Sequence, residues 1–143
     1  MPVEAAAMLT EEEAVARIAG LPGLVDADPG LVRRGRFLDA SVLVGVGERS
    51  VILDIRAGRV VAVAAGPGLM RSWVFAVRGS LRAWDAYWAP VPAPGWHDLF
   101  ALSKRGEMRF EGALQPFVAN LQYVKDLLAL PRRRGGDAAG GGA

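Results

Sequence analysis

Four side chains of the sequence are candidates for acid–base chemistry, namely His97, Asp98, Asp54 and Tyr123. An imidazole beside a carboxylate, as in His97-Asp98, is the combination that a general base and its orienting group need. Side chains of adjacent residues seldom face each other, however, and Asp98 stands at the start of a predicted helix, where its carboxylate can cap the first turn. We therefore expect no catalytic residue, and these four side chains are the candidates for the alternative hypothesis of an enzyme.

The sequence predicts neither a nucleophile nor a metal centre. Its five serines, at positions 41, 50, 72, 80 and 103, lie outside the G-x-S-x-G pattern that exposes a nucleophilic serine. With no cysteine and one histidine, a zinc site would depend on carboxylates, so we expect no metal and no cofactor. Asp39 and Asp54 interrupt apolar strands and would form a carboxylate pair only if their faces converged. We expect each of them to face solvent or to accept hydrogen bonds in the sheet.

The basic composition does not indicate nucleic-acid binding. The chain of 143 residues has 17 basic and 15 acidic side chains and a pI near 9.5. Three of the basic residues are Arg132–Arg134, and only one acidic residue follows Pro131, so residues 1–131 are formally neutral. Because residues 1–131 have no net charge, we expect no positive electrostatic potential that would attract nucleic-acid phosphates. Gly45-Val46-Gly47 lies between two predicted strands with no helix behind it and therefore predicts a hairpin turn, not a phosphate loop.

Aromatic residues are concentrated in one part of the chain. Eight tryptophans and phenylalanines fall within 45 residues: Trp73, Phe75, Trp84, Trp88, Trp96, Phe100, Phe110 and Phe117. Large rigid side chains on a sheet and on facing helices are difficult to interdigitate completely, and ligand pockets are typically lined by such groups. Each residue alone is equally compatible with an ordinary core. Together they favour the wall of an apolar pocket.

Short helices are predicted before residue 35. Thr10 followed by three glutamates is typical of a capping box, and Gly20 and Pro22-Gly23 are expected to end that helix. A second short helix is expected within Leu24–Arg34, a stretch that Pro29-Gly30 interrupts.

Alternating apolar residues predict a largely antiparallel sheet, with further helices after its fourth strand. The strands are expected at residues 36–46, 51–56, 60–64, 73–77 and 107–111. Ser80 is expected to cap a helix with Leu81, Trp84 and Trp88 on one face, and Asp98 a shorter one. The last helix, from Ala113 to Leu130, has an apolar stripe about 120° wide on a helical wheel of 100° per residue. The stripe consists of Leu114, Phe117, Val118, Leu121, Val124 and Leu128.

From Leu31 to Pro131 the order of these elements resembles the sterol carrier protein type 2 (SCP-2) domain family. The resemblance depends on three sequence runs: Val51–Ile55 with Arg59–Val61, Phe75–Gly79 leading to Trp84, and Gly106–Gly112 before the last helix. It implies an α+β fold, with a five-stranded mostly antiparallel sheet covered by helices and an apolar cavity under the C-terminal helix. Family members bind sterols, fatty acids or acyl-CoA. The positions that would line the cavity are Trp73, Phe75, Trp84, Trp88, Phe100, Phe110, Phe117 and Leu121.

We therefore expect one SCP-2-like domain over residues 1–131, with an N-terminal helical segment at 9–34 and a disordered basic, glycine-rich tail at 132–143. The proline-rich segment Pro90–Trp96 departs from the family pattern beside the pocket. We expect no secretory signal, no transmembrane segment and no peroxisomal address, and therefore a cytoplasmic location.

The expected function is non-enzymatic binding or transport of a hydrophobic small molecule. The alternatives are a small enzyme acting on a hydrophobic substrate in the same pocket and an accessory module for a partner enzyme; a homodimer also stays open. Ligand binding predicts that the variants Trp84→Ala and Phe117→Ala remain folded but bind less tightly.

Overall fold

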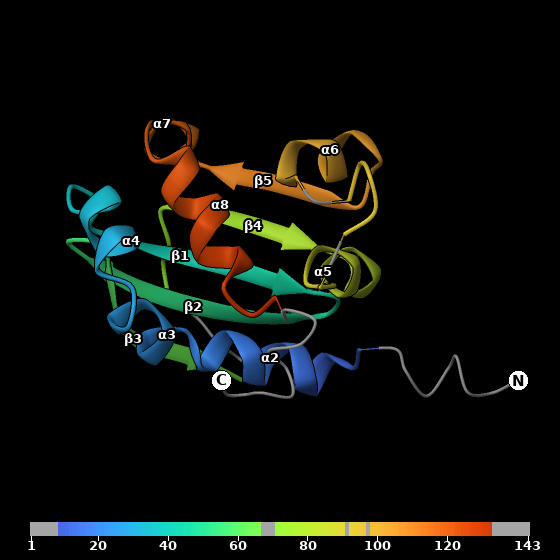
Figure 1. Cartoon of the computed structure of the whole chain (residues 1–143), viewed down its shortest axis with the longest axis horizontal. Coiled ribbons are helices and arrows are strands. Elements are labelled where there is room, and N and C mark those ends of the chain that lie inside the picture. The colour runs from blue at the N-terminus through green and yellow to red at the C-terminus, as the bar shows by residue number, and fades with distance from the viewer. Residues whose placement is uncertain (1–8, 67–70, 91, 97, 133–143) are drawn as a thin grey trace, which may run out of the picture.

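A computed structural model describes residues 9–66, 71–90, 92–96 and 98–132 of the chain (Figure 1). A single five-stranded sheet runs through the domain in the order β3-β2-β1-β4-β5. The strands are β1 (Ala40–Val46), β2 (Arg49–Arg56), β3 (Arg59–Ala65), β4 (Phe75–Gly79) and β5 (Met108–Gly112). His97 and the predicted tail beyond Arg132 lie outside the described residues.

The sheet is mixed. Three neighbouring pairs are antiparallel, but β1 and β4 are parallel, with Val42 opposite Phe75 and Val44 opposite Val77. The first three strands form a meander in which β3 is an outer strand, and β4 then pairs with the free side of β1. The expectation of a mostly antiparallel sheet is therefore correct for three pairs of four.

Helices cover one face of this sheet (Figure 1). They are α2 (Glu11–Ala19), α3 (Leu21–Asp26), α4 (Pro29–Arg34), α5 (Leu81–Tyr87), α6 (Leu99–Lys104), α7 (Leu114–Ala119) and α8 (Leu121–Ala129). Three predicted caps are confirmed: Thr10 makes a capping box with Glu13, and Ser80 and Asp98 accept the backbone N–H of Ala83 and Ala101.

The first helix ends where the sequence predicts, with Gly20 as the C-cap of α2, but a further helix starts directly after it and has Pro22 in its first turn. The predicted interruption at Pro29-Gly30 falls slightly earlier, at Ala27-Asp28, and Pro29 begins α4. Proline is tolerated there because the first N–H groups of a helix have no acceptor within the helix. The strand expected from residue 36 begins later, at Ala40, after a turn in which the Leu38 N–H donates to Gly35 O.

The long C-terminal helix predicted from Ala113 to Leu130 is two helices. Asn120, with φ −119° and ψ 29°, ends α7 and precedes α8. The break changes which residues are buried: Phe117 is buried, whereas Val118 is 60% exposed although the predicted stripe included it. On one straight helix Phe117 and Tyr123, six positions apart, would point about 120° away from each other. In the structure Phe117 packs against Phe75 of β4 and Tyr123 against Gly35 after α4.

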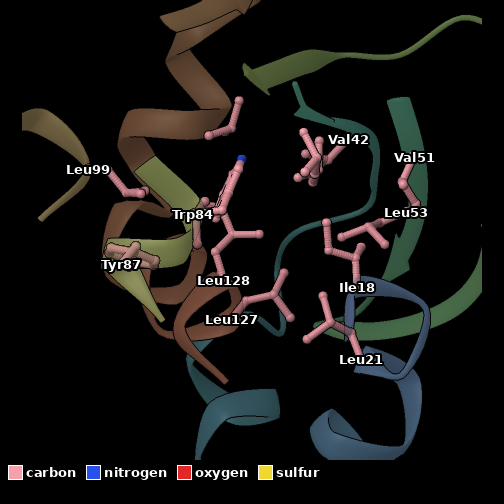
Figure 2. Close-up of a cluster of buried hydrophobic side chains, with 14 of the residues drawn as sticks. Ile18, Leu21, Val42, Val51, Leu53, Trp84, Tyr87, Leu99, Leu127 and Leu128 are labelled. Carbon is pink, nitrogen blue, oxygen red and sulfur yellow. The ribbon is translucent and has the colours of Figure 1, made fainter. Parts of the chain in front are cut away.

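The main core lies between the helices and the covered face of the sheet. Figure 2 shows Ile18 and Leu21 pointing toward Val42 and Leu53, with Trp84 among the same side chains. A smaller apolar cluster on the opposite face consists of Leu43, Ile52, Ala76 and the partly buried Trp73. The fold therefore buries aromatic residues on both faces of the sheet.

The expectation that Trp73 shares a face with Phe75 is wrong. Trp73 precedes β4, and it packs in the cluster that β1, β2 and β4 form on the face away from the helices. The two-residue period holds only within the strand, from Phe75 onward, so it could not fix the direction of a side chain outside the strand.

Candidate functional site

Four phenylalanines form a continuous cluster at the β4–β5 side of the helical layer. Phe75 and Phe110 come from neighbouring strands, Phe100 from α6 and Phe117 from α7. The ring of Phe117 lies 5.4 Å from Phe75, 4.8 Å from Phe110 and 6.0 Å from Phe100, measured between centroids. Phe100 and Phe110 are 5.4 Å apart, edge to face. Phe117 therefore joins the strands to the two helices.

This phenylalanine cluster extends to the surface. Phe75 and Phe117 are buried, Phe110 is half-buried and Phe100 is 37% exposed. Leu114 and Val118, on the same helix as Phe117, are 44% and 60% exposed. An apolar path thus leads from solvent at α6 and α7 to the inner face of β4.

The helix over this path is weakly attached. α7 has six residues, no side chain caps its N-terminus, and Phe117 is its only buried residue. Short helices are marginal without tertiary packing, and segments with few buried contacts open at the lowest free-energy cost. The Phe117 side chain is therefore the main attachment of α7 to the domain.

Trp84 and Trp88 belong to the centre of the core, apart from the phenylalanine cluster. Both are buried, with ring centroids 5.1 Å apart, and Tyr87 contacts Trp84 edge to face. Trp84 Nε1–H donates to Gly45 O at 2.9 Å, and Trp88 Nε1–H donates to Leu128 O at 2.7 Å. Buried tryptophans usually find such an acceptor for the indole N–H. Leu121 is half-buried at the start of α8 and packs against the same core.

The described acid–base candidates do not converge on one site. Asp54 lies on the face away from the helices, where it accepts hydrogen bonds from Ser41 and Arg71. Tyr123 Oη donates to Gly58 O at 2.7 Å, and burial raises the pKa of Tyr123 to about 12. Asp98 caps α6 and makes an ion pair with Lys125. Asp39 accepts the Ala57 N–H, so it does not form a carboxylate pair with Asp54.

The ion pair between Asp98 and Lys125 is expected to make a pH-dependent contribution to the stability of the fold. Burial opposes its ionisation, but hydrogen bonds from Lys125, 2.6 Å away, and from the Ala101 N–H outweigh burial and lower the Asp98 pKa below its ordinary value. A carboxyl whose pKa is lower in the folded protein stabilises it above the unfolded-state pKa, and this stability is lost as pH falls through the folded-state pKa.

We expect Asp98→Asn to keep the α6 cap but to lower the free energy of unfolding at pH 7 by about 1 kcal/mol. The difference from the parent protein should shrink as the pH is lowered below about 4. Urea titrations from pH 7 to pH 3 measure it. Asp98→Ala, which also removes the cap, should lose stability at every pH. A constant difference between Asp98→Asn and the parent protein would contradict this account of the ion pair.

A polar hollow of about 510 Å³ lies at the opposite end of the sheet, around Gly47, Gly79 and Gly106. Its charges are largely paired: Ser80 Oγ–H donates to Glu107, and Arg78 and Arg109 both contact Glu111 outside the hollow. Within the described parts of the chain, no three His, Asp or Glu side chains are grouped as metal ligands would be. We identify no cofactor-binding arrangement in these residues.

The fold of this domain is that of the SCP-2 domain, and the solved structures that resemble it are SCP-2 domain proteins. A crystal structure of sterol carrier protein 2 matches with a TM-score of 0.66 and 15% identity, covering 83% of this chain and 95% of that one. A conserved hypothetical protein from Thermus thermophilus, described as possibly a sterol carrier protein, matches with a TM-score of 0.60 and 16% identity, covering 86% and 90%.

A third similar structure is UbiJ-SCP2, a ubiquinone synthesis protein, with a TM-score of 0.53 and 21% identity over 87% of this chain and 95% of that one. The sequence matches no protein-family model and no curated protein. At these identities the likeness establishes the fold and leaves the ligand open. None of the helices described is long and apolar enough to cross a membrane.

Proposed function

We propose that this domain binds and carries a hydrophobic small molecule of the lipid class, such as a sterol, a fatty acid or an acyl-CoA. The observation that carries the proposal is the phenylalanine cluster, which extends from the surface to the inner face of β4 beneath a helix held by one buried side chain. The SCP-2 fold supports it, because two of the similar structures are described as sterol carrier protein 2.

The binding step that we propose is a displacement of α7. When Phe117 leaves the cluster, Phe75, Phe100 and Phe110 lose a shared ring contact and present an apolar surface. An aliphatic chain or sterol ring can replace that contact, with about 0.8 kcal/mol of transfer free energy for each methylene group removed from water. Several methylene groups are enough to offset the opening of so short a helix.

The enzyme alternative has less support. Its candidates Asp98 and Tyr123 have hydrogen-bond partners of their own, and Asp54 lies on the other face of the sheet. The phenylalanine cluster itself contains no titratable group. A partner enzyme and a homodimer remain predictions.

The proposed pocket predicts that Phe100→Ser weakens lipid binding about five- to tenfold, because part of the phenyl surface at the rim is lost. Displacement of a fluorescent fatty acid in vesicle-free buffer measures it, and native mass spectrometry of the purified protein identifies any bound lipid. Phe37→Ser is the matched control, since the same substitution is made at a phenylalanine that is 81% exposed and outside the cluster.

Both variants should remain folded, because neither side chain is buried in the main core. Equal binding by the two variants would place the ligand outside the phenylalanine cluster. Absence of any bound or displaceable apolar ligand across sterols, fatty acids and acyl-CoA would refute the proposed function.

A further inference from the structure

Three of the most exposed large apolar side chains project from one end of the domain. Phe37 is 81% exposed, Val118 is 60% exposed and Leu114 is 44% exposed. Phe37 lies just before β1, and Leu114 lies just after β5. The register of the sheet places the start of β1, the start of β4 and the end of β5 at the same end, as Figure 1 also shows for α7 and the α4–β1 connection.

Tyr123 ties these segments together. Its hydroxyl donates to Gly58 O in the β2–β3 turn, and its ring lies directly against Gly35. The α4–β1 connection, the β2–β3 turn and the start of α8 are therefore held together at this end, and α7 directly precedes α8 in the chain.

Arginines lie near Phe37 at this end of the domain. The Arg36 guanidinium lies over the Phe37 ring at 4.5 Å, and Arg33 and Arg56 are close in sequence to the same connections. Among the residues described, no carboxylate lies within ion-pair distance of Arg33, Arg36 or Arg56.

Three aspartates at this end pair with other arginines: Asp126 with Arg34, Asp26 with Arg59 and Asp54 with Arg71. Asp39 accepts the backbone N–H of Ala57 and so keeps its negative charge, which the three charges of Arg33, Arg36 and Arg56 outnumber. We call Phe37, Leu114 and Val118, together with Arg33, Arg36 and Arg56, the Phe37 surface; its unpaired charge is positive.

We propose that the Phe37 surface docks the domain on an anionic lipid bilayer; the proposal rests on the proposed lipid-binding function and names the surface through which lipid is exchanged. Exposed apolar side chains that share one end of a domain with unpaired cations match a bilayer interface, where rings and aliphatic groups enter the acyl boundary and guanidinium groups pair with lipid phosphates. A bilayer also requires no continuous groove, only side chains that project from the same end.

The position of α7 links docking to exchange. Leu114 and Val118 belong to the Phe37 surface, and Phe117 on the same short helix closes the phenylalanine cluster. A domain docked by this end therefore has the proposed entrance at the membrane, and a lipid can leave the bilayer without passing through water.

Co-sedimentation with extruded vesicles tests the proposal on the whole chain. We expect binding to phosphatidylcholine vesicles that contain about 30 mol% phosphatidylglycerol, and much weaker binding to phosphatidylcholine alone or in high salt. Phe37→Ser should reduce the partition coefficient about tenfold. The triple variant R33Q/R36Q/R56Q should reduce it about fivefold for each arginine.

Two matched controls are not part of the Phe37 surface. Leu24→Ser changes another exposed apolar side chain, and Arg82→Gln removes an arginine of α5 that lies over Trp96. Both should bind vesicles as the parent protein does. Vesicle binding that is absent in the parent protein, or unchanged in Phe37→Ser and in the triple variant, overturns the proposal. A change of oligomeric state in Phe37→Ser without a change in vesicle binding also overturns it, in favour of a protein interface.

The same variants separate this proposal from the function on which it rests. Phe37→Ser should retain fatty-acid binding in vesicle-free buffer and lose vesicle binding, whereas Phe100→Ser should show the reverse. If the proposed function is wrong and the docking proposal is right, the protein will bind vesicles but no lipid ligand. If only the docking proposal is wrong, the protein will bind a lipid ligand, but Phe37→Ser will not change vesicle binding.

Discussion

Trp84→Ala should lower the free energy of unfolding by about 3–5 kcal/mol, the range for large aromatic residues truncated in a core. Trp84 is fully buried, contacts Tyr87 and Trp88, and closes the space over Gly79. Truncation removes these contacts and leaves Gly45 O without its indole donor. Denaturant titration followed by far-ultraviolet circular dichroism measures the loss.

This result would correct an expectation drawn from the sequence, which treated Trp84→Ala as a folded variant with a weakened pocket. Trp84→Phe separates the two contributions, since it keeps much of the ring volume but removes the N–H donor, and it should cost about 1–3 kcal/mol. A loss under about 1 kcal/mol for Trp84→Ala would show that the space around this residue is loosely filled, as the wall of a ligand cavity would be.

Gly58→Ala should lower the free energy of unfolding by about 2–4 kcal/mol, because the new side chain strains the backbone and also clashes with its neighbours. Gly58 has φ +83°, and a Cβ at this position would lie 2.5 Å from Val32 O and 2.9 Å from the carbonyl carbon of Gly35. Both are backbone atoms and cannot move aside as a flexible side chain would. The Tyr123 hydroxyl donates to Gly58 O, so the disturbance also reaches α8.

Gly106→Ala is the matched control for this variant. Gly106 has a similar φ of +78°, but a Cβ there would meet nothing within 4 Å. Gly106→Ala should therefore lower the free energy of unfolding only through backbone strain, by about 1–2 kcal/mol. Equal losses for Gly58→Ala and Gly106→Ala in denaturant titrations would mean that the approach of the α4 end to the β2–β3 turn is not as tight as the structure has it.

Locally determined features were predictable from the sequence. Thr10, Ser80 and Asp98 cap helices because a short polar side chain before a helix can satisfy an N–H group of its first turn wherever the helix lies. The alternation over 51–56 and the turn at Ala57-Gly58 depend on neighbours in sequence in the same way. The resemblance to the SCP-2 domain was visible because the order of such elements is itself local information, and the solved structures confirm it for the fold.

The basic run Arg33-Arg34-Gly35-Arg36-Phe37 was also visible in the sequence but was not interpreted as a surface. Composition gave no reason to do so, since the body of the chain is formally neutral. Only the pairing of Asp26, Asp54 and Asp126 with other arginines leaves a local excess of positive charge at this end.

What the sequence determined by itself is therefore the set of elements, their caps and the abundance of aromatic residues that suggested a pocket. The tertiary structure alone decided how those residues are divided. It placed Trp84 and Trp88 in the core, Trp73 on the other face of the sheet, and four phenylalanines around α7. The physical reason is that side-chain burial depends on contacts between segments far apart in sequence, such as β1 with β4 and α7 with β4. These contacts leave no periodic pattern of apolar residues in the sequence, so they could not be predicted from it.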